Sequence, residues 1–132
     1  MNKIFVDASF FVALLKRDDP NHNNATRVVE KLVDKSFLYT NFIAVGEAAT
    51  VVSQRVGKKQ ANELVRSFEV GDYKEIQVDS EIITDASNIF LNQKSKNFPY
   101  FDALHASCMK KEGINRMLGF DKHFKKLGFT LL

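Results

Sequence analysis

The regular alternation of strand-like and helix-like segments is the feature that most constrains the fold of this chain. Short apolar runs rich in β-branched and aromatic residues predict strands at residues 3–7, 37–40, 73–78, 116–120 and 129–132. Between these runs, apolar residues recur at three- and four-residue intervals, which is the spacing of amphipathic helices. Strands that alternate with helices in this way predict an α/β fold with a central, mostly parallel sheet of four to five strands.

Helices are expected in every interval between the predicted strands, at residues 9–16, 25–33, 42–57, 61–71, 80–90, 100–112 and, as a short turn, 121–127. Asn41 is a residue type that caps a helix N-terminus, and Gly57 and Gly113 suit helix ends. No linker, repeat or low-complexity segment interrupts the pattern, and a chain of 132 residues suits one compact unit. We therefore expect a single domain over residues 1–132.

The cysteine content indicates the cellular compartment, and the net charge does not identify a binding partner. The net charge of +3, from 19 basic and 16 acidic residues, permits a polyanionic partner without requiring one. Cys108 is the single cysteine, which excludes an internal disulfide and suits a reducing compartment. No segment approaches the ~18 uninterrupted apolar residues of a membrane span, and the N-terminal segment lacks the features of a signal peptide. We expect a cytoplasmic protein with no membrane partner.

Three aspartates fall where a parallel sheet gathers its functional groups. Asp7 ends the first predicted strand, Asp121 ends the fourth, and Asp102 lies in the first turn of its helix within the segment FPYFDALHAS. In open α/β sheets, ligands bind beyond the carboxyl ends of the strands. Helix capping is the alternative explanation for Asp7 and Asp121, and interaction with a helix dipole is the alternative for Asp102. Asp79, in the similar segment QVDSE, is expected to be a plain cap.

Glu47 is the one acid in the otherwise apolar helical segment FIAVGEAATVVS. Capping does not explain an acid in the middle of a helix, and no basic residue lies within one helical turn of it. One explanation is that Glu47 lies where the helix meets water, and a second is a salt bridge to a distant lysine. The third is a divalent cation, since Mg²⁺ and Mn²⁺ prefer carboxylate oxygens and neutralise acids that otherwise repel one another. A metal ion would account for Asp7, Glu47, Asp102 and Asp121 together.

Four segments carry a resemblance to a known family, namely IFVDASFFVALL, VGEAATVV, FPYFDALHASCMKKEGI and GFDKHFKKLGF. In order and spacing the chain resembles PIN-domain ribonucleases, and more narrowly the VapC toxins of toxin–antitoxin pairs, over essentially its full length. The resemblance implies a three-layer α/β/α fold and a metal-dependent endoribonuclease that uses Mg²⁺ or Mn²⁺. The acidic positions of the family match Asp7, Glu47, Asp102 and Asp121, and Ser9 matches a position whose side chain supports the first aspartate.

The resemblance also implies partners: an RNA substrate, an antitoxin whose tail lies in a groove beside the early helices, and a second copy of the chain in a homodimer. The helix at residues 9–16 is apolar nearly all round, so we expect both its sides to be covered, either within the chain or by a partner. His123 and Lys122 are candidates for contact with the RNA. His105 follows the apolar face of its helix and is expected to be a buried core histidine.

Two departures from the family pattern keep another function open. Relatives often carry Ser or Thr two positions before the last acid, where this chain has Gly119, and aromatic residues precede Asp102 where polar residues are common. A degenerate PIN domain that binds RNA or protein without catalysis is therefore the alternative. Phosphatases of the haloacid-dehalogenase type also begin with an aspartate after the first strand, but they require a second aspartate where this chain has Ser9.

Overall fold

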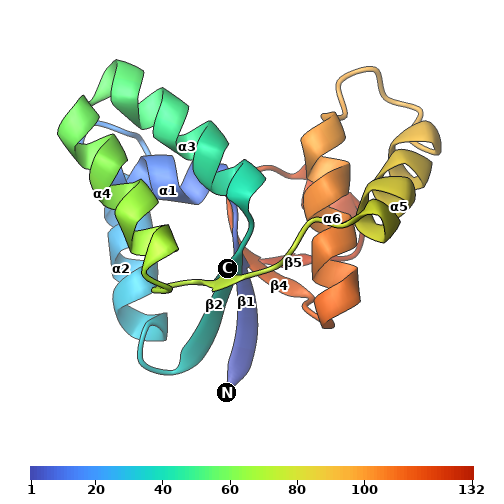
Figure 1. Ribbon diagram of the computed structural model, residues 1–132, viewed down its shortest axis with the longest axis horizontal. Coiled ribbons are helices and arrows are strands. Elements are labelled where there is room, and N and C mark those ends of the chain that lie inside the picture. Colours follow the sequence, from blue (N-terminus) through green and yellow to red (C-terminus); the bar gives the residue numbers. More distant parts are fainter.

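Five parallel strands form a single sheet at the centre of the molecule. The computed structural model describes residues 1–132, and Figure 1 shows the arrangement of its elements. The sheet has the strand order β3-β2-β1-β4-β5, and every neighbouring pair is parallel. The strands are β1 (Asn2–Val6), β2 (Ser36–Thr40), β3 (Lys74–Glu75), β4 (Arg116–Leu118) and β5 (Thr130–Leu131). The predicted α/β fold and parallel sheet are therefore confirmed.

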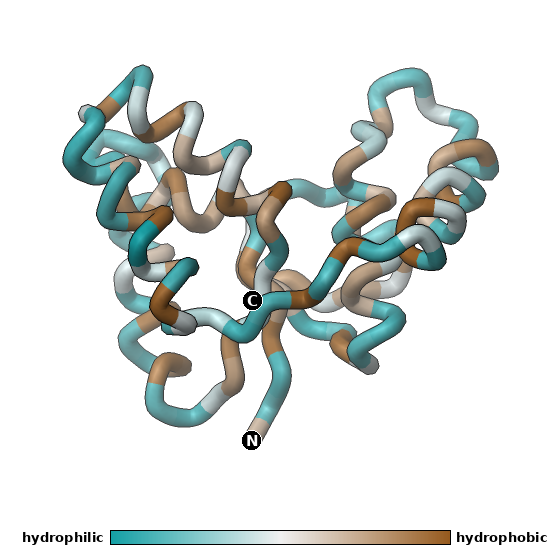
Figure 2. The backbone as a smooth tube through the Cα atoms, viewed as in Figure 1, coloured by the Kyte–Doolittle hydropathy of each residue, from teal (hydrophilic) through white to brown (hydrophobic).

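Helices cover both faces of this sheet, which makes the fold three-layered. They are α1 (Ala8–Leu15), α2 (His22–Leu32), α3 (Phe42–Arg55), α4 (Lys58–Glu69), α5 (Ser80–Leu91), α6 (Tyr100–Glu112) and α7 (His123–Lys126). Figure 1 shows α1 to α4 grouped on one side and α5 and α6 on the other. Brown and teal segments recur along the helices in Figure 2, as amphipathic helices require.

Strand β1 divides the hydrophobic core into two parts because successive side chains of a strand point to opposite faces. Ile4 and Val6 belong to the cluster that packs with α1 to α4, whereas Phe5 belongs to the cluster that packs with α5, α6 and α7. All three side chains are fully buried. The central strand thus holds two apolar layers together and delivers its next residue, Asp7, to the carboxyl edge of the sheet.

Two strands, β3 and β4, are shorter than the sequence predicts. The strand expected at residues 73–78 is limited to Lys74–Glu75, and the strand expected at 116–120 ends at Leu118. Strand β3 has only one neighbour, so beyond this pair a single backbone hydrogen bond, from Ile76 to Thr40, continues its contact with β2. The helix expected at 25–33 begins earlier, at His22. The sequence did not predict this first turn because it faces solvent and carries no apolar pattern.

The helix after β1 is covered largely by the chain itself. Phe10 and Phe11 of α1 are buried, and Val12, Leu14 and Leu15 pack partly buried against the same core. Burial within the chain is thus the main reason for the apolar character of α1. No helix combines the length and the apolar character needed to cross a membrane.

Candidate functional site

Four acidic side chains from remote parts of the chain lie near one another at the carboxyl edge of the sheet, and we call them the acidic cluster: Asp7, Glu47, Asp102 and Asp121. Asp7 follows β1 and Asp121 follows β4, and these strands are neighbours that pair through Val6 and Leu118. Asp102 comes from the first turn of α6 and Glu47 from the middle of α3. The parallel topology therefore brings together all four acids singled out in the sequence.

Asp7 occupies the N-cap position of α1, but its side chain makes no capping hydrogen bond to the helix. Asp7 is only 6% exposed, and burial raises the pKa of its carboxyl above the ordinary value. The Ser9 hydroxyl donates to Asp7 Oδ2 at 3.1 Å and accepts from the Phe120 N–H at 3.3 Å. Ser9 thus ties Asp7 to the segment after β4.

Asp102 and Asp121 form the most crowded part of the acidic cluster. No group donates a hydrogen bond to the buried Oδ2 of Asp102. Burial, above all, raises the pKa of Asp102 to about 8, and the neighbouring Asp121 raises it further through a hydrogen bond to the protonated form and through charge repulsion. Asp7 and Glu47 add smaller repulsions. An acid with such a pKa holds a proton at neutral pH unless a cation takes its place.

Glu47 lies at the exposed side of the acidic cluster, and this exposure explains why an otherwise apolar helix carries an acid. Its side chain is 42% exposed, and its Oε1 lies 3.3 Å from the imidazole Nε2 of His105. The partner expected for Glu47 was either a distant lysine or a cation, and no lysine contacts it. The helix face that carries Glu47 thus meets water on one side and His105 on the other.

His105 is buried, which confirms the core histidine expected there, but it also lies against the acidic cluster, which the sequence did not predict. It is 1% exposed, as a core histidine should be, but its Nε2 also lies 3.7 Å from Asp7 Oδ1. Its spacing of three residues from Asp102 is the signal that places both side chains on one face of α6. The buried Asn41 amide contacts its other ring nitrogen, Nδ1, at 3.0 Å.

Gly119 lies directly against Asp7. A Cβ atom at this position would come within 3.2 Å of Asp7 Cβ and 3.5 Å of Asp7 Oδ2. A side chain at position 119 would therefore crowd Asp7 and Met117. The hydroxyl that contacts Asp7 comes from Ser9 instead.

The acidic cluster has the residue types that a hard divalent cation prefers, but its side chains are not oriented to bind one. Carboxylates are the ligands that Mg²⁺ and Mn²⁺ prefer, and the undonated Asp102 Oδ2 is an oxygen that a cation would satisfy. However, no group of three or more His, Cys, Asp or Glu side chains is arranged as a ready-made metal site. Binding an ion would therefore require the Asp102 proton to leave and the carboxylates to turn toward a common point.

The acidic cluster is an open edge rather than an enclosed cavity. The side chains of Glu47 and Asp121 are 42% and 33% exposed. The largest cavity, of about 1020 Å³, lies elsewhere, beside α1 to α4, and its basic lining residues are Lys16, Arg17, His22, Arg55 and Lys59. None of the four cavities is lined by a member of the acidic cluster. An open acidic edge suits a polymer better than a small molecule.

The remaining candidates lie at different distances from the acidic cluster. The His123 backbone N–H donates to Asp121 Oδ1 at 2.9 Å, while its ring packs against Phe98. Lys122 is exposed next to Asp121. Asp79 caps α5 through the Ile82 N–H at 2.9 Å, which confirms the plain cap expected for it.

The fold and the site define a three-layer α/β protein with an acidic edge on a parallel sheet. The family model described as PIN domain matches residues 4–130, and the chain therefore belongs to the PIN-domain family. The chain is similar to the 23S rRNA-specific endonuclease VapC20 of Mycobacterium tuberculosis, with 27% identity over 129 residues that cover 96% of this chain and 95% of the relative.

Solved structures share the whole fold. The crystal structure of VapC20 from Mycobacterium tuberculosis, described as a sarcin-ricin loop cleaving toxin, matches with a TM-score of 0.89 and 24% identity over 98% of both chains. The structure of VapBC2 from Rickettsia felis, bound to a DNA fragment from its promoter, matches with a TM-score of 0.73 and 16% identity over 98% of this chain and 97% of that chain.

Proposed function

We propose that this protein is a metal-dependent endoribonuclease that hydrolyses RNA phosphodiester bonds and acts as the toxin of a VapBC-type toxin–antitoxin pair in the cytoplasm. The observation that carries the proposal is the convergence of Asp7, Glu47, Asp102 and Asp121 at one edge of the sheet, where burial above all, and the neighbouring acids after it, raise the pKa of Asp102 to about 8. A divalent cation would relieve both the burial of these carboxylates and their repulsion. Membership of the PIN-domain family supports the same conclusion.

In this proposal, Asp7, Glu47, Asp102 and Asp121 would hold Mg²⁺ or Mn²⁺, and the bound ion would supply positive charge against the phosphodiester and a more acidic water. The chain's own residues prepare the site for the ion. Ser9 donates to Asp7 and fixes its carboxylate against the segment after β4. The raised pKa of Asp102 keeps a proton on this carboxyl at neutral pH, so the acidic cluster does not carry its full negative charge in the metal-free protein.

RNA contacts are proposed beside Asp121. Lys122 is exposed there, and His123 is partly exposed with its Nε2 at 3.6 Å from Asp121 Oδ1. Cations beside the acidic edge would hold the phosphates on either side of the bond that is cut. Because the similar M. tuberculosis protein is named a 23S rRNA-specific endonuclease, 23S rRNA is the first substrate to test.

A protein partner is proposed for the early helices. The cavity of about 1020 Å³ beside α1 to α4 combines the apolar Leu14 and Leu15 with Lys16, Arg17 and Arg55. Such a lining suits an antitoxin segment that carries both apolar and acidic residues. We also propose that the protein is a homodimer, as the VapC resemblance implies.

The test is cleavage of 23S rRNA with Mg²⁺ or Mn²⁺, compared with the same reaction in a chelator. Wild-type protein should cut only when metal is present, and Asp102→Asn should lose cleavage while it stays folded. Excess of a cognate antitoxin should stop the reaction. Equal cleavage by the wild type and Asp102→Asn would refute the catalytic role of the acidic cluster.

A non-catalytic binding module is the second candidate function. The observation that favours it is the lack of a ready-made metal geometry among the acidic side chains. A titration with Mn²⁺ separates the two functions, because a working acidic cluster binds the ion and displaces the Asp102 proton. A protein that binds RNA but neither binds Mn²⁺ nor releases a proton would be the binding module.

A further inference from the structure

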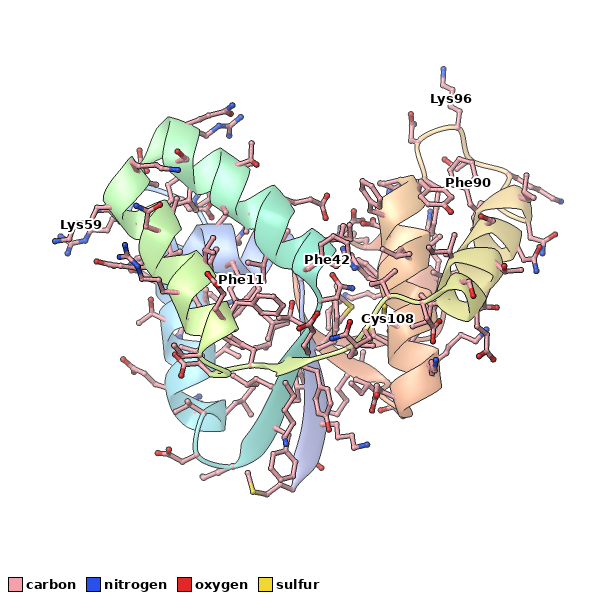
Figure 3. All side chains as sticks on the ribbon, viewed as in Figure 1. Phe11, Phe42, Lys59, Phe90, Lys96 and Cys108 are labelled. Carbon is pink, nitrogen blue, oxygen red and sulfur yellow. The ribbon has the colours of Figure 1, made fainter.

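Asn41 connects the start of α3 with two side chains of α6, which lie far from it in the sequence. Its Oδ1 accepts from the Ala44 N–H at 2.9 Å and so caps α3. Its Nδ2 lies 3.0 Å from His105 Nδ1 and 3.4 Å from Cys108 Sγ. Asn41 is fully buried, and Figure 3 shows Cys108 of α6 close to the start of α3, where Phe42 is labelled.

These contacts determine which way the Asn41 amide points. If the amide were flipped, its NH₂ would face the Ala44 N–H, and two donors would meet in a buried place. The cap therefore keeps the oxygen of Asn41 toward α3 and the NH₂ toward α6. An NH₂ group only donates, so the His105 Nδ1 that faces it must accept.

The ring of His105 then has a defined tautomer. A neutral imidazole that accepts at Nδ1 carries its proton at Nε2. Nε2 lies 3.3 Å from Glu47 Oε1 and 3.7 Å from Asp7 Oδ1. The helix cap of α3 is in this way linked, through one amide and one imidazole, to two members of the acidic cluster.

We propose that Asn41 and His105 form a positioning pair, in which the α3 cap orients the Asn41 amide and the amide directs the His105 Nε2–H toward Glu47 and Asp7. His105 is then a donor that holds the Glu47 carboxylate in place beside Asp7 and not a ligand, because its Nε2 lone pair is used for the proton. The effect on metal binding rests on the proposed function, whereas the tautomer does not. Partners that orient metal ligands commonly contribute about 10- to 100-fold to metal affinity.

The first experiment reads the tautomer in the metal-free protein. Nitrogen-15 NMR of the histidine side chains should show the His105 proton at Nε2 in the wild type. In Asn41→Asp, the new carboxylate still accepts from Ala44 but can only accept from His105, so Nδ1 should become protonated. The matched control is Asp79→Asn, which exchanges the same residue types at the cap of α5 and should leave His105 unchanged. A wild-type protein with its proton at Nδ1 would overturn the pair.

The second experiment measures Mn²⁺ affinity by calorimetry in two variants of His105. A glutamine can place an amide N–H near the position of Nε2, whereas an asparagine reaches only the position of Nδ1. His105→Gln should therefore keep most of the affinity, while His105→Asn and Asn41→Asp should lose about 10- to 100-fold. Equal affinities of the Gln and Asn variants would overturn the positioning role.

The two experiments also separate this inference from the proposed function. A wild-type protein that binds no Mn²⁺, with the His105 proton at Nε2, would refute the proposed function and still support the tautomer assigned to the pair. A protein that binds Mn²⁺ with full affinity in Asn41→Asp would refute the positioning pair and leave the proposed function intact.

Discussion

Asp7 and Asp79 lie in nearly the same local sequence, FVDAS and QVDSE, and both take the N-cap position of a helix with an extended backbone. Asp79 uses its carboxylate as a cap, accepts from the Ile82 N–H, and pairs with Lys111. Asp7 makes no such capping bond and instead lies buried between Ser9 and His105. The same local pattern thus has two different roles.

Position in the sheet explains the difference. Asp7 follows β1, which has β2 and β4 as neighbours, so its carboxylate emerges among the side chains of several elements. Asp79 follows the edge strand β3 by three intervening residues, where it meets mainly solvent and α6. A cap is sufficient for an exposed acid, whereas a buried acid needs partners from distant parts of the chain.

The largest expected difference between the two acids is in RNA cleavage. Asp7→Asn should lower the rate at least about 100-fold, because a lost metal ligand removes several kcal/mol of transition-state stabilisation. Asp79→Asn keeps its cap and should cut at the wild-type rate. The measurement is single-turnover cleavage of 23S rRNA in Mg²⁺. A comparable loss in both variants would show that the two acids do not differ in function.

Gly119 should reveal how tightly Asp7 is held. Gly119→Ser introduces a Cβ atom 3.2 Å from Asp7 Cβ, and this overpacking should destabilise the fold by about 1 to 2 kcal/mol. Urea unfolding measures the change. Gly113→Ser is a control of a different kind, since nothing lies within 4 Å of a Cβ there but φ is +69°. If Gly119→Ser unfolds at the wild-type urea concentration, Asp7 has room to move.

The contributions of Asp102, beside Asp7, and of Asp79 to the free energy of unfolding should change with pH in opposite directions. Asp102, beside Asp7, has a pKa raised from 3.8 to about 8, so the native state binds a proton that the unfolded chain releases. Its contribution to stability is complete below about pH 4 and is lost as the pH rises toward 8. The hydrogen bond from Lys111 lowers the pKa of Asp79, so its contribution is present at neutral pH and lost in acid.

Unfolding in urea between about pH 5 and 8, without metal, measures the Asp102 effect. Wild-type stability should fall across this range, and Asp102→Asn should remove most of the fall because its side chain does not titrate. Saturating Mn²⁺ should also weaken the fall, since the ion replaces the proton. A slope that Asp102→Asn leaves unchanged would contradict the raised pKa.

The smallest expected effect is loss of the Asp79 cap. Asp79→Ala removes the acceptor for the Ile82 N–H and should lower the melting temperature by a few degrees, while Asp79→Asn should cost less because asparagine also caps. Lys111→Ala should change it less still, since exposed ion pairs contribute little. Differential scanning calorimetry orders the three variants, and an opposite order would mean that the ion pair outweighs the cap.

Local patterns were sufficient to predict the parallel α/β sheet and the placing of Asp7 and Asp121 at its carboxyl edge, whereas the three layers were implied by the family resemblance. Apolar alternation in β1 predicted a strand, and Asp7 at its end followed from the parallel topology. The pairing of His105 with Asn41 spans 64 positions, and no local pattern predicts it. The lengths of β3 and β4 could not be predicted from the sequence either, because the ends of a strand depend on the neighbouring strands with which it pairs.

The pairing of β1 with β4 delays the completion of the acidic cluster during synthesis. Phe5 pairs with Met117 and Val6 with Leu118. Strand β1 therefore cannot pair with its second neighbour, β4, until nearly the whole chain has been synthesised. A nascent chain that grows at about 5–20 residues per second exposes Asp7 and Glu47 seconds before Asp102 and Asp121 are made. A chain with this topology therefore cannot assemble the complete acidic cluster until most of its residues have been translated.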